Sequence, residues 1–260
     1  MAEAHASHAP LPKEMRREAY ATMYALEGEH WWFVGRRRII RAIVDATMQA
    51  GGLGRDARLL DVGCGTGKNL EMLRTMARAE GVDVSDDALA FCKQRGLTDV
   101  QKGEIEGLPY RDGEFDLVTA FDVVEHLDDD VAGLREMRRV LKPGGRGVFF
   151  VPAFQFLWGV QDDVSHHRRR YTEPEFLRVV ERAGFVVERS SYANATMFLP
   201  TFLGRALMKV TGFRPASEND VNVGALNKPL GALLGAERHW LTRSRLPFGV
   251  SIFCVARNPG

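Results

Sequence analysis

The stretch Asp61-Val-Gly-Cys-Gly-Thr-Gly67 decides the fold, because three glycines at alternate positions directly follow a short apolar segment. That segment, Arg58 to Val62, has the composition of a strand. Residues Asn69 to Arg78 have the apolar spacing of a helix. Glycines between a strand and a helix allow a tight turn and a close approach of a ligand to the backbone. The stretch therefore predicts a ligand-binding loop at the carboxyl end of a strand.

The spacing of the glycines separates the possible nucleotide-type ligands. A phosphate-binding P-loop needs G-x-x-x-x-G-K-[ST], but Val62 replaces its first glycine and Asn69 its Ser or Thr. The dinucleotide fingerprint G-x-G-x-x-G differs from the G-x-G-x-G found here. A glycine-rich turn without a ligand is the simplest alternative. Asp83, at the end of the next apolar segment, argues against it, because a carboxylate there can accept both hydroxyl hydrogens of a ribose.

Strands and helices alternate along the remaining sequence, which predicts an α/β fold with a doubly wound, mostly parallel sheet. Ser85 is expected to cap the helix that follows Val84. The segment 192–249 is long for a connection and is expected to be partly helical. Further strands are expected to end at 84 and to cover 99–102, 115–120, 146–151, 185–191 and 250–257, and further helices to cover 14–49, 86–95, 129–141 and 172–183.

This order of elements predicts a single domain over residues 14–260. Residues 1–13 lack the apolar run of a signal peptide and are expected to form a disordered tail. The parts expected within the domain are a helical cap (14–52), a cofactor-binding core (57–191), a helical insertion or lid (192–249) and the last strand (250–257).

Composition limits the classes of function. The 260 residues are 45% hydrophobic and 27% charged, as in ordinary globular proteins. The 35 basic and 34 acidic residues give a net charge of +1, so no bulk field attracts nucleic acid. Cys64, Cys92 and Cys254 lie far apart, which fits a reduced, cytoplasmic compartment. The apolar stretch 195–210 is too short and too charged for a transmembrane segment, although peripheral membrane contact stays open.

Five motifs together resemble class I S-adenosylmethionine-dependent methyltransferases of the small-molecule type. Their order and spacing agree over about residues 57 to 190. The motifs are Leu59-Leu-Asp-Val-Gly-Cys-Gly-Thr-Gly67, Gly81-Val-Asp-Val-Ser85, Gly103-Glu-Ile-Glu106 with Leu108-Pro109, Phe115-Asp-Leu-Val-Thr-Ala-Phe-Asp-Val-Val-Glu-His-Leu127 and Leu141-Lys-Pro-Gly-Gly145.

The resemblance implies a Rossmann-like fold of seven strands and S-adenosylmethionine as cofactor. In the family, the glycines approach the methionine part of the cofactor and the acid at Asp83 holds the ribose. Glu104 and Ile105 would flank the adenine, although an aspartate is commoner than Glu104 there. Phe121 would lie near the loop that supports the sulfonium. The implied cofactor-binding set is Asp61, Gly63, Cys64, Gly65, Gly67, Asp83, Val84, Glu104, Ile105, Phe121 and His126.

Methyl transfer needs little more than positioning and the exclusion of water, but an oxygen or carbon acceptor usually also needs a base. Histidine is the favoured base near neutral pH, so His126 and His167 are the catalytic candidates. Packing beside the cofactor loop is the alternative for His126. Asp122, Glu125 and His126 also resemble a magnesium site of ubiquinone-pathway O-methyltransferases, but that site opens with Glu. No metal is therefore assigned.

Two clusters are candidates for contact with the acceptor. Ser165-His-His-Arg-Arg-Arg-Tyr171 contains an H-x-R-R-Y pattern that is recurrent in these enzymes. Its arginines could hold an anionic substrate, or the run could be a solvated face with Tyr171 in the core. The stretch beginning His30-Trp31-Trp32-Phe33 is similar to the HWWF-x-GRR stretch of bacterial relatives, and three adjacent aromatics cannot all face one side of a helix. The expected substrate contacts are Trp31, Trp32, Arg37, His166 and Tyr171.

These observations predict methyl transfer to a small-molecule or lipid-like acceptor, with oxygen as the favoured atom. Nitrogen or carbon acceptors, a dinucleotide-dependent oxidoreductase and a non-catalytic cofactor-binding protein are the alternatives. Met197, Phe198, Phe202 and neighbouring apolar residues predict an apolar wall of the substrate site, with core packing or a dimer face as alternatives. The chain is expected to be a monomer or a homodimer.

Overall fold

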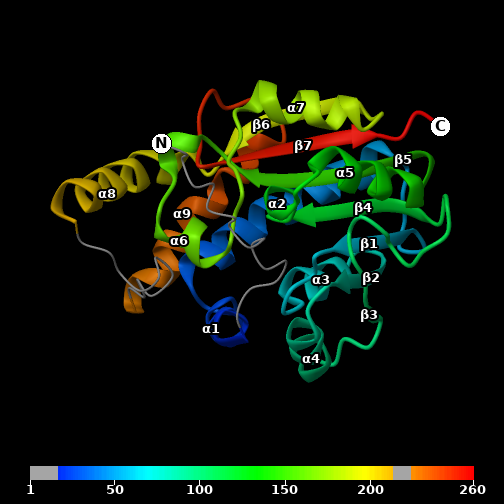
Figure 1. Cartoon of the computed structure of the whole chain (residues 1–260), viewed down its shortest axis with the longest axis horizontal. Helices are drawn as coiled ribbons and strands as arrows, with labels where there is room; N and C mark the ends of the chain where they lie inside the picture. Colours follow the sequence, from blue (N-terminus) through cyan, green and yellow to red (C-terminus); the bar gives the residue numbers. More distant parts are fainter. Residues whose placement is uncertain (1–16, 213–223) are drawn as a thin grey trace, which may run out of the picture.

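The computed structural model describes residues 17–212 and 224–260, and a seven-stranded sheet forms its centre (Figure 1). The strand order is β3-β2-β1-β4-β5-β7-β6, and β7 runs antiparallel to both of its neighbours while the other pairs are parallel. This order confirms the predicted Rossmann-like sheet. The strands are β1 (Arg58–Val62), β2 (Arg78–Asp83), β3 (Val100–Lys102), β4 (Phe115–Phe121), β5 (Leu141–Pro152), β6 (Val186–Ala193) and β7 (Ser251–Arg257).

Helices cover both faces of the sheet, because side chains along each strand alternate between its two sides. On one face Ile39 and Ile43 of α2 pack in the same core as Leu59. On the other face Leu134 of α5 packs in the same core as Leu60. The α-helices are α1 (Arg17–Leu26), α2 (Trp31–Ala50), α3 (Lys68–Leu73), α4 (Asp86–Gln94), α5 (Asp130–Val140), α6 (Val160–Val164), α7 (Glu173–Arg182), α8 (Phe198–Thr211), α9 (Asn227–Ala236) and α10 (Arg238–Leu241).

Some element boundaries differ from the sequence prediction. The helix expected over 14–49 is interrupted between α1 and α2, where the His30 side chain accepts a hydrogen bond from Trp32 N as the N-cap of α2. The helix expected to reach Arg78 ends at Leu73, because Arg78 pairs with Arg58 in the sheet instead. Ser85 caps α4 as predicted. The tail expected at 1–13 lies outside the described residues.

Asp61, near the end of β1, is a buried acid in the centre of the sheet. It is 2% exposed and accepts a hydrogen bond from Thr119 Oγ1 of β4 at 2.7 Å. Burial raises the pKa of this carboxyl to about 7, although the hydrogen bond from Thr119 acts in the opposite direction. The end of β1 is therefore pinned to β4 by a group whose charge state changes near neutral pH.

Between β6 and β7 lie α8, α9 and α10, preceded by the 3-10 turn η3 (Ala195–Met197), while η5 (Gly224–Leu226) precedes α9. α9 packs on α2 through glycines. A Cβ on Gly35 would lie 2.8 Å from Leu234 Cβ and 3.0 Å from the Gly231 carbonyl oxygen. Close packing of these helices therefore depends on the missing side chain. No described helix has both the length and the apolar character needed to cross a membrane.

Gly35→Ala should destabilise the protein by about 1–3 kcal/mol, because the added methyl group overpacks the α2–α9 contact. The matched control is Gly54→Ala, since a Cβ at Gly54 meets nothing within 4 Å. Urea denaturation of both variants would measure the difference. Equal free energies of unfolding for the two variants would show that α2 and α9 do not need this close approach.

Asp61→Asn should change the pH dependence of stability. The folded-state pKa of about 7 exceeds the ordinary 3.8, so stability from the protonated carboxyl is present at low pH and lost as pH rises through 7. Between about pH 4 and about pH 7, the free energy of unfolding of the variant should rise relative to that of the wild type by up to ~1.4 kcal/mol per pH unit. A constant cost of burying the amide does not alter this slope. If the free energies of unfolding of the wild type and of Asp61→Asn change with pH in parallel, the raised pKa is contradicted. The control is Asp56→Asn, which alters an exposed acid.

Candidate active site

Three glycines shape the loop between β1 and α3. Gly63, Gly65 and Gly67 have φ angles of 67°, 55° and 88°, in the left-handed region that favours glycine. A Cβ on Gly63 would lie 2.5 Å from Val123 Cγ2, and one on Gly67 would lie 2.9 Å from Cys92 Sγ. No other residue fits these two positions without strain. The loop thus presents backbone rather than side chains at the end of β1.

A cavity with a volume of about 1040 Å³ lies beside this loop. It extends from Asp83 and Glu104 at the strand ends to Gln161 of α6 and Thr201 of α8. A volume of this size exceeds that of many single-ligand sites, so it can hold a cofactor and an acceptor together. Predicted site residues in its wall are Trp31, Trp32, Arg37, Gly63, Cys64, Gly65, Asp83, Val84, Glu104, Ile105, Phe121, His126, His166 and His167.

Asp83 links the glycine loop to the end of β2. Its carboxylate accepts hydrogen bonds from Gly65 N at 2.8 Å and from Ser85 N at 3.0 Å. The side chain is 7% exposed and forms part of the cavity wall. A carboxylate oxygen can accept more than one hydrogen bond, so this position suits a ligand with hydroxyl groups.

Two residues of the predicted cofactor-binding set lie outside the cavity wall. Asp61 is buried behind the loop and bonds to Thr119. Gly67 faces Leu97 and Cys92, so its backbone conformation and close packing explain the glycine there. Both residues shape the loop from behind, and the expectation of direct contact is corrected for them.

Tyr171 also lies away from the cavity, in contrast to its expected role as a substrate contact. It is 4% exposed and packs against Phe176 with ring centroids 5.2 Å apart. Its hydroxyl donates a hydrogen bond to Asp130 at 2.9 Å. Burial raises the pKa of this phenol, as does the charge of Asp130. Tyr171 is therefore a core residue, and it holds the end of the basic run Arg168–Arg170 on the protein.

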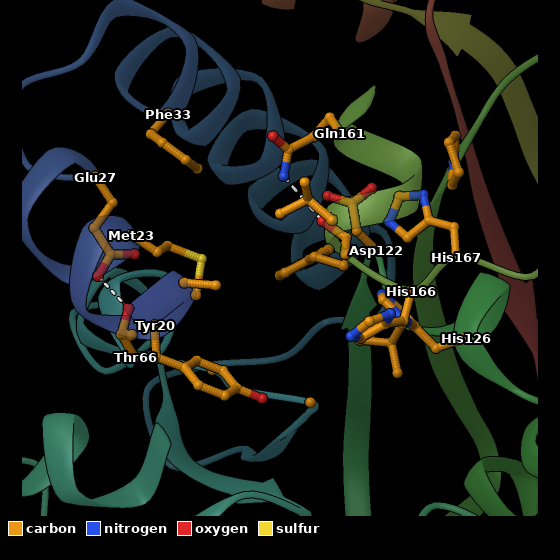
Figure 2. Close-up of a pocket in the computed structure, with 18 of the residues that line it drawn as sticks. Tyr20, Met23, Glu27, Phe33, Thr66, Asp122, His126, Gln161, His166 and His167 are labelled. Atoms are coloured by element: carbon orange, nitrogen blue, oxygen red, sulfur yellow. Dashed lines mark hydrogen bonds between the residues drawn. The ribbon is translucent and has the colours of Figure 1, made fainter. Parts of the chain in front are cut away.

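Helix α1 contributes residues to the wall of the cavity that were not among the predicted site residues. Figure 2 shows Tyr20, Met23 and Glu27 across the cavity from Asp122 and the histidines. Glu27 accepts hydrogen bonds from Thr66 Oγ1 and from Arg95, although burial raises its pKa. Thr66 and Arg95 are 39 and 68 residues away in the sequence. No local pattern could have paired them with Glu27.

The start of α2 brings the adjacent tryptophans to the same cavity. Trp31 and Trp32 pack edge to face with centroids 5.8 Å apart, and both line the wall. Arg37 donates to the carbonyl oxygen of Glu27 at 2.6 Å, which ties α2 to the end of α1. The Arg36 guanidinium lies 5.7 Å from the Trp32 ring centroid. The aromatic stretch is therefore both a packing element and a part of the cavity wall.

Arg36 makes a two-pronged ion pair with Asp122, and its second nitrogen lies 2.8 Å from Asp122 Oδ1. The charge of Asp122 raises the pKa of Arg36 in spite of burial. Asp122 has a φ of 57°, so the backbone at the end of β4 is held in an unfavourable conformation. This ion pair neutralises Asp122, the first of the three residues, with Glu125 and His126, that resemble a magnesium site.

The remaining donor set does not fit a magnesium ion well. Ligand atoms of Glu125, His126 and His167 lie within 4.8 Å of one another. Burial raises the pKa of Glu125 well above its usual range, and the charge of Asp122 adds to the shift. Magnesium prefers several oxygen ligands, and Glu125 is the only carboxylate of this set. We therefore assign no magnesium ion to it.

His167 forms a hydrogen-bonded pair with a buried carboxylate. Its Nδ1 lies 2.8 Å from Asp162 Oδ1, whereas its Nε2 lies 3.7 Å from Glu125 Oε1. Burial opposes ionisation of Asp162, but the hydrogen bond from His167 and the charge of Arg170 lower its pKa to about 2. Asp162 is thus an anion that orients His167 and leaves Nε2 as the nitrogen for chemistry.

Two histidines near His167 in the wall, His126 and His166, differ in environment. Burial lowers the pKa of His126 to about 3, and neighbouring His167 adds to the shift, so this imidazole is neutral near pH 7. Its ring packs edge to face on His167 at 4.8 Å. His166 has a φ of 56°, a left-handed conformation at which side chains are strained. The chain thus bends at His166 to bring three imidazoles to one side of the cavity (Figure 2).

The arginines that follow the histidines bind the protein itself. Arg168 donates to the His126 carbonyl oxygen at 2.5 Å, and Arg169 donates to the Leu127 carbonyl oxygen at 3.0 Å. Arg170 donates to Asp162 at 2.7 Å. These contacts connect the basic run to the end of β4 and to the histidine pair. They favour the structural interpretation of the run over an anion-binding one.

Comparison with known proteins agrees with this geometry. A family model described as a methyltransferase domain matches residues 60–149. A Mycolicibacterium smegmatis protein described as a probable S-adenosylmethionine-dependent methyltransferase is 32% identical over 184 residues, which cover 68% of each chain. A ubiquinone biosynthesis O-methyltransferase of Xanthomonas oryzae pv. oryzae is 31% identical over 138 residues, or 47% of this chain and 56% of that protein.

The fold is also found in solved structures. A SAM-dependent methyltransferase from Thermotoga maritima superposes with a TM-score of 0.54 at 18% identity, covering 94% of this chain and 100% of that one. At this identity the likeness concerns the fold alone. The family assignment depends on the sequence relatives and on the glycine loop with Asp83. This chain belongs to the class I S-adenosylmethionine-dependent methyltransferases, and S-adenosylmethionine is its cofactor.

Proposed function

We propose that this enzyme methylates an oxygen atom of a small-molecule or lipid-like acceptor. The observation that carries the proposal is that His167, which pairs with the buried Asp162, lies in the wall of the same cavity as Asp83 and the glycine loop. An oxygen acceptor has a proton to lose, and an oriented histidine is suited to accept it. The similarity to a ubiquinone biosynthesis O-methyltransferase supports the choice of oxygen.

The wall residues at the strand ends suit the cofactor. A Cβ on Gly65 would lie 3.4 Å from Met23 Cε of α1, so the glycine leaves room between the loop and α1. Asp83 would hold the ribose hydroxyls, and Glu104 with Ile105 would flank the adenine. When bound, the cofactor supplies a methyl group on a positively charged sulfonium. Phe121 and the neutral His126 would lie beside that group without adding a positive charge.

His167 would accept the acceptor's proton at Nε2. Asp162 holds Nδ1 and its negative charge stabilises the imidazolium that results. The hydrogen bonds from Arg170 and from Gly159 N to Asp162 fix the carboxylate in turn. The pair therefore needs no rearrangement when the proton moves, which is the main advantage of a preorganised base.

The acceptor would enter between two segments that cover the cavity. Trp31, Trp32, Arg37 and His166 form the wall on this side. We assign residues 14–52 as the cap and residues 192–249 as the lid of one domain. Closing both would exclude water from the transferring group and align the acceptor oxygen with it. Incubation with labelled cofactor and metabolite pools, followed by mass spectrometry, tests the proposal. A product labelled on nitrogen or carbon would overturn it.

Asp83→Ala should weaken binding of S-adenosylhomocysteine more than about tenfold, because charged hydrogen bonds worth ~1.5–3 kcal/mol are lost. Isothermal titration calorimetry measures the change. The control is Asp86→Ala, which removes an exposed acid near the same strand end that pairs with Lys102 at the surface. Unchanged affinity in Asp83→Ala would refute the ribose-binding role.

His167→Ala should lower kcat by about 10²–10⁴-fold, which is the usual contribution of a general base. Affinity for S-adenosylhomocysteine should stay nearly unchanged, since His167 lies on the acceptor side of the cavity. His239→Ala, which alters an exposed histidine of α10, should leave both quantities unchanged. Full activity of His167→Ala would show that this histidine serves packing rather than proton transfer.

A further inference from the structure

Helix α8 carries an exposed apolar surface, which we call the α8 patch. Leu199, Leu203, Leu207 and Val210 lie at spacings of four, four and three residues, so they share one side of the helix. Their exposed fractions are 60%, 55%, 63% and 86%. Phe156, which is 53% exposed, extends the patch beside Phe202, and their ring centroids are 6.1 Å apart. Contiguous exposed apolar surface of this kind marks an interaction site.

The opposite side of α8 is held on the protein. Arg205 is 7% exposed and donates to the Leu157 carbonyl oxygen. Phe198 packs on Phe248 with ring centroids 5.3 Å apart. α8 extends away from the sheet at one end of the molecule (Figure 1). The helix is therefore anchored along one side while the α8 patch faces outward.

The stretch of chain that contains the patch is basic, because residues 194–250 include seven basic and three acidic residues. Among the described residues 194–212 and 224–250, Glu237 is the one acidic residue. It is 3% exposed and accepts hydrogen bonds from Ala195 N at 3.0 Å and Thr196 N at 2.8 Å, so it adds no negative charge to the surface. The exposed basic residues of the same stretches are Lys209, Lys228, Arg243 and Arg245, of which Arg245 pairs with Glu173. This balance contrasts with the whole chain, whose net charge is +1.

We propose that the α8 patch docks on an anionic lipid surface. Apolar side chains on one side of a helix enter the interface, while basic residues nearby attract anionic head groups. A second copy of this chain fits less well. A symmetric dimer would place the same surface on itself and bring like charges such as Lys209 together. Charge complementarity therefore selects the lipid surface as the occupant.

Docking would place the cavity at the membrane surface. Thr201 and Arg205 of α8 line the cavity, while Leu203 and Leu207 of the same helix face outward. An acceptor dissolved in the lipid could then reach the cavity along α8 without crossing water. This consequence rests on the proposed methylation of a lipid-like acceptor, whereas the docking itself does not.

The test is co-sedimentation of the full chain with vesicles of phosphatidylcholine alone and of phosphatidylcholine mixed with phosphatidylglycerol. The protein should sediment with the mixed vesicles, and less so as salt is raised, because salt screens the basic residues. Leu207→Asp should lower the bound fraction at least about tenfold, because it replaces an inserting apolar side chain by an anion. Val186→Asp, which alters an exposed residue at the far end of edge strand β6, is the matched control and should bind like the wild type.

Calorimetry with S-adenosylhomocysteine should give equal affinity for the wild type and Leu207→Asp, which shows that the variant is folded. The proposal would be overturned if the protein did not sediment with the mixed vesicles. It would also be overturned if Val186→Asp lowered the bound fraction as much as Leu207→Asp does. A dimer in sedimentation velocity that Leu207→Asp dissociates would assign the patch to a second copy instead. Binding to vesicles without any O-methylated product would leave the docking intact and refute only the proposed function.

Discussion

The constraint on which this site depends is the left-handed backbone at alternate positions after β1. Gly63, Gly65 and Gly67 adopt it, and at Gly63 and Gly67 a side chain would also collide with its neighbours. The turn brings Gly65 N within 2.8 Å of Asp83, so one carboxylate ties the loop to the next strand. The donor half of the cavity follows from this contact, because each strand end along the sheet adds its residue to the same edge.

This half could be predicted from the sequence because its determinants are local. The glycine spacing, the acid after the second strand and the alternation of strands and helices each occupy a short window. The mostly parallel sheet, the strand positions and the cap at Ser85 agree with those expectations. Where local patterns failed, tertiary pairing decided the outcome. Arg78 continues a helical pattern but pairs with Arg58 in the sheet.

The segments that cover the cavity could not be predicted in the same way, because buried acids hold them through side-chain contacts that no sequence pattern reveals. Glu27 joins α1 to Thr66 and Arg95, and Asp162 joins α6 to His167 and Arg170. Both acids look like ordinary polar positions in the sequence. Tyr171 shows the opposite case, since a recurrent pattern suggested a ligand contact and the side chain lies in the core.

The same acids determine what the cavity can hold. Asp122 is paired with Arg36, Asp162 with Arg170, and Glu27 with Arg95. Each of these three acids therefore has its own arginine partner. A strongly anionic acceptor would find these three arginines already paired with acids of the protein. These pairs and the tryptophans in the cavity wall suit the uncharged, lipid-like acceptor of the proposed function.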